Sequence, residues 1–507
     1  MSSASCNNQA DKLLRLDRIE DTEPLNVIFI LSDDHRYDFM GFTEKVPWLR
    51  TPNMDRMASE GAHLKNAFVT TSLSSPSRAT ILTGQYSHVH GVVDNQASIP
   101  EGLIFFPEYL QEAGYETSFF GKWHMGNVDH QPQPGFDHWV SFRGQGVYWN
   151  PTLNVDGKII EYRDSTYLTD LLTDYAINWM ESRTGESPFF LYLSHKAVHE
   201  RCEPAKRHRG MYAGNKYTYP KSYSIPEYGL TIPPTYNEQT DELKSGRDFY
   251  GDPRIPDWVR HQRESWHGVD PAIYHGSAIE ISSLDEMVID YCETLMSVDE
   301  SIGRVIEYLE DNGLAESTIV IYMSDNGWSF GEHGLIDKRH FYEESARVPL
   351  LAYCPGVIDS SVVIDRLIQN IDIAPTILEA AGLQYPENMQ GLSFLPFIYG
   401  KETEWRDQIY YEYFWEYDYP STPTTFGVRS DRYKYIRYHG IWDTNEFFDL
   451  QEDPHEINNL IDCPDHQKLI EEYVDALYTW LENTDGMQIP LKRVMHDKRD
   501  HRNIGTR

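Results

Sequence analysis

The sequence has few cysteines and few basic residues, and it has no long apolar run. Its five cysteines are scattered without a CxxC pair, so the pattern predicts neither a disulfide framework nor a zinc site. Lysine and arginine number 44 against 79 acidic residues, and this net charge of -35 argues against a nucleic-acid partner, which needs a basic surface. The apolar runs are strand-sized, far below the roughly 20 residues of a membrane helix, so we expect no transmembrane segment.

The N-terminus lacks the charged and apolar regions of a secretion signal. Residues 1–24 are polar, and we expect them to form a disordered leader. Residues 4–8, however, resemble the end of a bacterial lipoprotein cleavage site. On that interpretation Cys6 carries a lipid anchor in the full precursor, and the protein is periplasmic or extracellular.

Four short apolar, β-rich segments are each followed directly by polar residues. They are residues 27–31 before 32–35, 117–120 before 121–124, 189–193 before 194–199, and 318–323 before 324–327. Helical patterns lie between them, at residues 51–61, 107–114 and 287–312. This alternation predicts an α/β fold with a large, mostly parallel sheet between layers of helices. Because such sheets bind ligands at the carboxyl ends of their strands, we expect the polar residues to form one site.

The domain organisation follows from changes in this pattern. Residues 25–400 are predicted to form an N-terminal α/β catalytic domain, interrupted at about 201–275 by an insertion without clear periodicity. Residues 401–507 are predicted to form a smaller α+β subdomain with an antiparallel sheet. Its expected elements are strands at 409–414, 425–429, 434–438 and 446–450 and a helix at 467–481.

The segment from Ser74 to Gly84 carries the most specific motif. A small residue precedes a proline that opens a helix, and Arg78 follows one turn later, which favours an anion at the helix start. The string Ser74-Ser-Pro-Ser-Arg78, followed by Thr83-Gly84, resembles the sulfatase signature, which specifies conversion of its first residue to formylglycine (3-oxoalanine).

The resemblance extends in the family's order over about residues 25 to 480. Its further landmarks are Asp33-Asp34, residues 51–56, 121–124, 324–327, 333–338, 372–376, 433–436, 448–450 and 453–454. It implies the alkaline-phosphatase-like fold and a sulfuric ester hydrolase that removes sulfate from a sulfated polysaccharide or oligosaccharide. It also implies a formylglycine-generating or radical maturation enzyme as a partner.

The resemblance further implies a calcium ion, for which carboxylate and amide oxygens are suitable ligands. The metal ligands on this reading are Asp33, Asp34, Asp325, Asn326 and the modified residue 74. Lys122 and Lys338 would hold the sulfate and compensate its charge.

In the implied mechanism, the hydrated aldehyde at position 74, a gem-diol held by Arg78, attacks sulfur. His124 would then take a proton so that sulfate leaves, and His199 would be the general acid for the sugar oxygen. The family usually has Ala-Pro-His where this chain has Ala197-Val198-His199, so His195 stays an alternative acid. We also expect Arg207 and Trp442 to contact the sugar.

Other readings remain open. Many family members have cysteine at position 74, so Ser74 is either native to a serine-type sulfatase or replaces a cysteine in an inactive form. The rival functions are a phosphonate monoester or phosphodiester hydrolase of the same superfamily and an inactive carbohydrate-binding pseudo-sulfatase.

Overall fold

The computed structural model describes residues 14–490, except residues 21, 127–129, 224–252, 264–267, 269–283, 418 and 441–442. Its centre is a ten-stranded sheet with the order β13-β2-β12-β9-β1-β8-β4-β5-β6-β7. The four predicted apolar segments form its four middle strands, which are β9 (Thr318–Ser324), β1 (Asn26–Ser32), β8 (Phe189–Ser194) and β4 (Glu116–Gly121). These four strands pair in parallel, as predicted.

Shorter strands extend the sheet on both sides, and several of them are antiparallel. They are β13 (Val362–Ile364), β2 (Ala62–Leu64) and β12 (Leu350–Tyr353) on one side and β5 (His138–Ser141), β6 (Thr152–Val155) and β7 (Lys158–Glu161) on the other. Two small pairs lie outside this sheet, β3 (Ala67–Phe68) with β14 (Ile368–Gln369) and β10 (Ser329–Phe330) with β11 (Ile336–Asp337).

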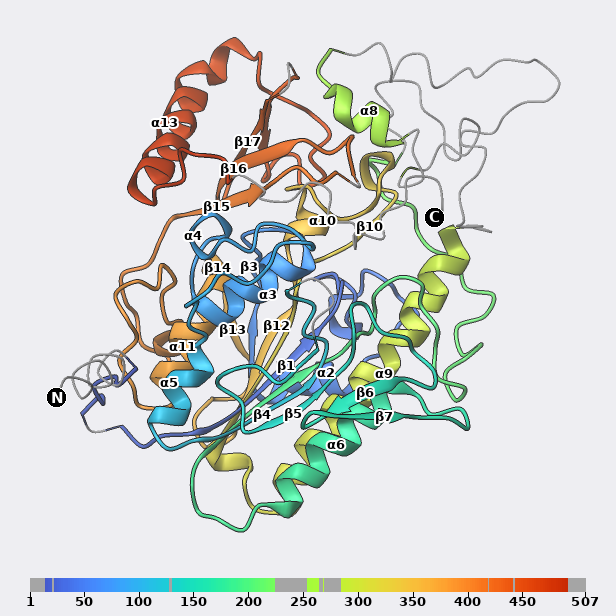
Figure 1. Ribbon diagram of the computed structural model, residues 1–507. Coiled ribbons are helices and arrows are strands. Elements are labelled where there is room, and N and C mark those ends of the chain that lie inside the picture. Colours follow the sequence, from blue (N-terminus) through green and yellow to red (C-terminus); the bar gives the residue numbers. More distant parts are fainter. Residues whose placement is uncertain are drawn as a thin grey trace.

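Helices cover both faces of the sheet (Figure 1). One face packs against α2 (Pro52–Glu60), α6 (Leu168–Ser182) and α9 (Leu284–Asp311). The other packs against α3 (Ser74–Thr83), α5 (Phe106–Glu112), α11 (Ile373–Ala380) and α12 (Leu395–Ile398). Alternate side chains of the middle strands therefore enter two separate cores, since successive residues of a strand point to opposite faces.

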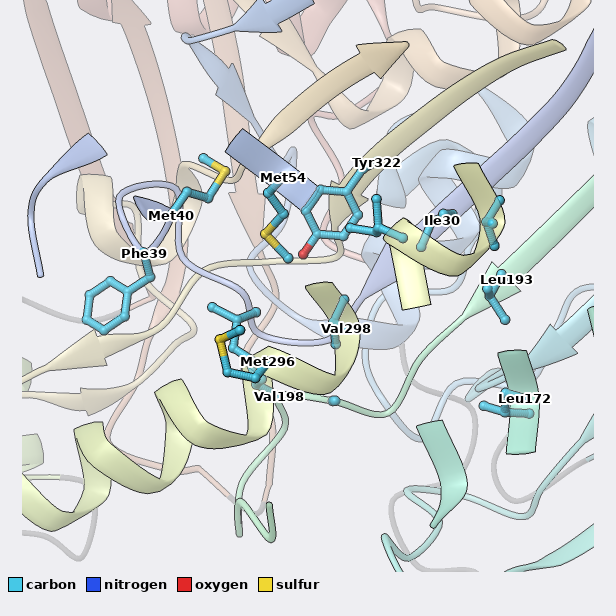
Figure 2. Close-up of a cluster of buried hydrophobic side chains, with 14 of the residues drawn as sticks. Ile30, Phe39, Met40, Met54, Leu172, Leu193, Val198, Met296, Val298 and Tyr322 are labelled. Carbon is cyan, nitrogen blue, oxygen red and sulfur yellow. The ribbon is translucent and has the colours of Figure 1, made fainter. Parts of the chain in front are cut away.

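Figure 2 shows part of the first core, where Ile30 and Leu193 from the sheet lie among side chains from the helices and loops on that face. All the apolar side chains labelled there are buried. The predicted layered α/β fold is confirmed.

The C-terminal part of the sequence forms a separate antiparallel sheet (Figure 1). Its strand order is β15 (Gln408–Tyr413), β16 (Thr424–Ser430), β17 (Tyr433–His439) and β18 (Glu446–Asp449). Helix α13 (Gln467–Asn483) packs on this sheet. The small predicted antiparallel subdomain is confirmed in its elements, whereas its boundary at residue 400 stays a prediction. The chain also forms the short helices α4 (Ser87–His90), α8 (Asp257–Arg263) and α10 (Glu343–Ala346).

In the part of the chain that the structure describes, no helix combines the length and the apolar character that a membrane crossing requires.

Candidate active site

The carboxyl ends of the four middle strands converge on one site. Asp33 and Asp34 follow β1, Asp325 and Asn326 follow β9, and Lys122 follows β4. The loop after β8 lies against β1, because the Asp33 amide donates to the Ala197 carbonyl at 3.0 Å and the Val198 amide donates to the Asp33 carbonyl at 2.8 Å. The strand order therefore brings together side chains that are up to about 290 residues apart in sequence.

Ser74 lies at the N-terminus of α3, as the motif predicts, and it is fully buried. Its Oγ is 3.4 Å from Asp33 Oδ1. One turn on, Arg78 Nε donates to Asp325 Oδ2 at 3.0 Å, and its Nη1 donates to the Lys122 carbonyl at 2.7 Å. The helix start and the guanidinium of Arg78 thus place positive potential beside Ser74, which suits an anionic substrate group.

Four acidic or amide side chains form a buried oxygen cluster. Asp33, Asp34, Asp325 and Asn326 all have no exposed surface. Asn326 Nδ2 donates to Asp34 Oδ1 at 2.6 Å, and the Asp34 amide donates to Asp325 Oδ1 at 3.1 Å. Among the described side chains, Asp34 Oδ2 and Asn326 Oδ1 are buried oxygens without a hydrogen-bond partner. Such a set of hard, under-satisfied oxygens fits a calcium-type cation.

Two lysines reach this cluster from different segments. Lys122 Nζ contacts Asp33 Oδ2 and also donates to Gln145 Oε1 at 2.6 Å, whereas Lys338 Nζ contacts Asp34 Oδ1. Both lysines are almost completely buried. They lie where they could bind the peripheral oxygens of a tetrahedral anion positioned beside Ser74.

The local charges shift the pKa values of the two adjacent aspartates in opposite directions. Burial raises the pKa of Asp33, but Lys122, Arg78 and Lys338 outweigh it and lower that pKa to about 2. Burial raises the pKa of Asp34 to about 7, because the neighbouring Asp33 and Asp325 offset much of the effect of Lys338. Asp34 is therefore the member of the cluster that gains most from a further positive charge.

Two histidines face the same space. Buried His124 has a left-handed backbone with φ 56°, and its Nδ1 has no hydrogen-bond partner among the residues that the structure describes. His199 Nε2 is 3.9 Å from Asp34 Oδ2, while its Nδ1 lies 2.6 Å from the Glu200 carbonyl and so carries a proton that it donates there. Burial lowers the pKa of both rings, and the nearby lysines lower it further.

These groups open into a pocket of about 310 Å³. It is lined by Asn95, Gln96, His124, Gly144, Gln145, His199, Glu200, Trp328, Asp337, Lys338, Arg339, Glu416 and Tyr419. The sequence analysis did not identify Gln145, Arg339 or Glu416, because only the fold brings them to the pocket. The one available signal for Gln145 was its position between Gly144 and Gly146, which both have positive φ and present the side chain at a tight turn.

Other predicted substrate residues lie elsewhere. His195 is buried behind the strand end, with its Nε2 3.0 Å from Ser301 Oγ on α9, since it points to the opposite face of the sheet from Ser194. Arg207 forms ion pairs with Asp170 and Glu300 at 2.7 and 2.5 Å, so its charge is already neutralised outside the pocket. Trp442 lies outside the described residues.

The family models agree with this geometry. The model described as Sulfatase matches residues 25–383, and the model described as N-sulphoglucosamine sulphohydrolase, C-terminal, matches residues 331–483. The chain belongs to the sulfatase family. As a sulfatase it is an enzyme, and the predicted resemblance is confirmed.

Similar proteins support this family assignment. An N-acetylglucosamine-6-O-sulfatase of Bacteroides thetaiotaomicron is 34% identical, over 94% of this chain and 88% of the relative. A solved structure of a protein in complex with its substrate D-glucosamine-2-N,6-O-disulfate has a TM-score of 0.77 at 31% identity, covering 93% of this sulfatase and 100% of that chain.

A phosphonate monoester hydrolase of Agrobacterium radiobacter has a TM-score of 0.66 at 22% identity, covering 91% of this chain and 96% of that chain. At this level of identity the likeness concerns the fold alone.

Proposed function

We propose that this sulfatase removes sulfate from a sulfated amino sugar, with Ser74 converted to formylglycine and with calcium bound by the oxygen cluster. The observation that carries the proposal is the convergence of Ser74, Arg78, two lysines and two histidines on one buried oxygen cluster. A pseudo-sulfatase that only binds sugar would have no chemical use for this complete set.

Each side chain has a role in this proposal. Asp33, Asp34, Asp325 and Asn326 hold the metal together with residue 74, and Arg78 orients residue 74 while neutralising Asp325. Lys122 and Lys338 bind the sulfate oxygens from two sides and stabilise the charge that develops on them. When bound, calcium would supply Lewis-acid stabilisation of the sulfate group, and the hydrated aldehyde of formylglycine would supply the hydroxyl nucleophile for attack on sulfur.

The histidines then move protons. His199 lies at the pocket side of the cluster and, when protonated at Nε2, donates to the departing sugar oxygen. His124, with its free Nδ1, accepts the proton that must leave residue 74 so that sulfate is released. These two proton transfers need the two rings on different sides of the sulfate. His124 follows β4 and His199 follows β8, so the rings lie on different segments.

The proposed substrate class rests on the relatives. One is named an N-acetylglucosamine-6-O-sulfatase, and the solved structure holds D-glucosamine-2-N,6-O-disulfate. Their identities of 34% and 31% over nearly the whole chain support a sulfated hexosamine for this protein.

Two further parts of the proposal concern the cell. A formylglycine-generating or radical maturation enzyme would act on the segment around Ser74, for which the signature Ser74 to Arg78 is the supporting observation. A periplasmic or extracellular location, with a lipid on Cys6, is supported only by the residues around Cys6, which lie outside the described part of the chain.

The first test is mass spectrometry of the peptide that contains Ser74, on protein from a maturation-competent host. We expect the loss of H2 at Ser74, together with release of sulfate from N-acetylglucosamine 6-sulfate that stops on calcium chelation and returns on calcium addition. An unmodified serine in such a host, or turnover of a phosphonate ester in place of the sulfate ester, would contradict the proposal.

A further inference from the structure

The outer part of the pocket carries an excess of negative charge. Lys338 binds the sulfate group in the proposed function, and the other charged side chains among the described lining residues are Glu200, Asp337, Arg339 and Glu416. Three carboxylates thus face one guanidinium. Asn95, Gln96 and Gln145, which also line the pocket, carry neutral amides.

The guanidinium of Arg339 is already bound on several sides. Its Nη1 donates to Asp337 Oδ2 at 2.5 Å, its Nε donates to Glu416 Oε2 at 2.8 Å, and its Cζ lies 3.3 Å from the ring centre of Tyr419. Arg339 is 4% exposed and Glu416 is also 4% exposed. An anionic ligand that drew Arg339 away would leave a buried carboxylate without its counter-ion, which is costly.

The backbone holds this cluster in place. Asp337 and Arg339 have φ of 100° and 84°, conformations that residues other than glycine adopt only under constraint. The Tyr413 hydroxyl donates to Glu416 Oε2 at 3.0 Å, so the antiparallel sheet fixes Glu416 from behind. The carboxylates of Glu200, Asp337 and Glu416 form what we call the acidic wall of the pocket. With Asp337 and Glu416 held in this way, the acidic wall is rigid and cannot easily turn away from a ligand.

We propose that this wall selects the leaving group by charge, with Glu416 as a specificity-determining residue. The preferred sugar carries an uncharged or ammonium-bearing substituent in addition to its sulfate ester, and a second sulfate or a carboxylate on the same sugar is disfavoured. The inference rests on the proposed function, because it concerns the sugar from which the same sulfate group is removed.

The experiment compares two 6-O-sulfated sugars that differ in one charge, N-acetylglucosamine 6-sulfate and N-sulfoglucosamine 6-sulfate, with matured, calcium-loaded enzyme. We expect kcat/KM to favour the N-acetyl sugar by about tenfold or more, the size of effect that one partly screened charge repulsion gives. In Glu416→Gln the preference should shrink by several-fold, since Arg339 then has more positive charge available to a ligand. Glu200→Gln provides a second variant, on a separate segment, with the same expected direction.

The matched control is Glu412→Gln. Glu412 is a buried glutamate of β15 that bonds His88 of the catalytic domain and does not line the pocket. This variant should lose thermal stability while keeping the substrate preference. Equal kcat/KM for both sugars in the enzyme without substitutions would overturn the inference and leave the proposed function intact. A change of preference in Glu412→Gln as large as in Glu416→Gln would also overturn it. Failure to cleave either sugar would overturn both proposals.

Discussion

At the scale of single residues, His195 and His199 show how closely spaced candidates acquire different surroundings. Both follow β8, and the sequence left either as the general acid. His195 lies in the core beside Ser301, whereas His199 lines the pocket near Asp34. Because general acid catalysis needs direct reach to the leaving oxygen, the geometry favours His199.

His199→Ala should lower kcat for a sulfated sugar by about 10²- to 10³-fold, since general acid catalysis contributes factors of this size. The loss should be much smaller for a nitrophenyl sulfate, whose acidic leaving group departs without a proton. Steady-state kinetics on both esters measures the difference. His195→Gln serves as the control and should reduce the melting temperature with little change in kcat. Equal losses on both esters would exclude His199 as the acid.

The residues of the site differ in how far the sequence could predict them. Ser74, Arg78, Lys122 and Lys338 lie in motifs that the resemblance recognises, so they could be named from the sequence. Glu416 could not, because its role depends on a contact with Arg339, 77 residues earlier in the chain. Arg207 lies in a basic run that suggested sugar binding, but acidic neighbours from α6 and α9 pair with it instead.

At the scale of elements, the site depends on the close approach of β4 to β8 at their carboxyl ends. Gly121 has φ 125°, and a Cβ built there would lie 1.8 Å from the Ser194 carbonyl oxygen. The next amide, of Lys122, donates to that same carbonyl at 2.8 Å. A side chain at position 121 would therefore push Lys122 away from Asp33.

Gly121→Ala should destabilise the protein by at least about 3 kcal/mol and abolish activity, because overpacking and backbone strain add here. The control is Gly157→Ala, since Gly157 also has a positive φ, 86°, but a Cβ added there would meet nothing within 4 Å. That variant should lose only about 1 kcal/mol and remain active. Chemical denaturation and kcat together measure both effects. Similar losses in the two variants would mean that backbone conformation alone matters.

The strands that carry the site were predictable because each is a buried apolar run that ends in polar residues. The outer strands β2, β7 and β13 were not, since they have three or four residues and little apolar periodicity. Both β2 and β13 also depend on pairing with strands far away in sequence, β2 with β12 and β13 with β2.

At the scale of the whole molecule, His88 links the catalytic layer to the C-terminal subdomain. Its Nδ1 lies 2.7 Å from Glu412 Oε2 on β15, and its Nε2 lies 3.0 Å from the Thr484 carbonyl after α13. Burial lowers the pKa of His88, but the charge of Glu412 and these hydrogen bonds outweigh it and raise the pKa above its usual value. Protonated His88 therefore stabilises the docking of the two parts.

This arrangement makes stability depend on pH. Because the pKa of His88 is raised in the folded state, its stabilising contribution to the free energy of unfolding is fully present below about pH 6.5, the unfolded-state pKa. That contribution is lost as pH rises through the folded-state pKa. His88→Gln should destabilise the protein by about 2 kcal/mol at pH 6 and by less at pH 8.5, since it removes a charged hydrogen bond. Denaturant melts at the two pH values measure the difference. An equal loss of stability at both pH values would show that His88 acts as a neutral packing residue.

The complete burial of Ser74 has a consequence for the order of events in the cell. An enzyme that modifies this side chain needs the chain to be open around Ser74, as it is before β9 joins β1 and Arg78 donates to Asp325. During synthesis, about 240 residues separate Ser74 from β9, and at the usual 5 to 20 residues per second this leaves a window of tens of seconds. The topology that protects the finished site thus also provides an interval, while the chain is being made, in which it can be matured.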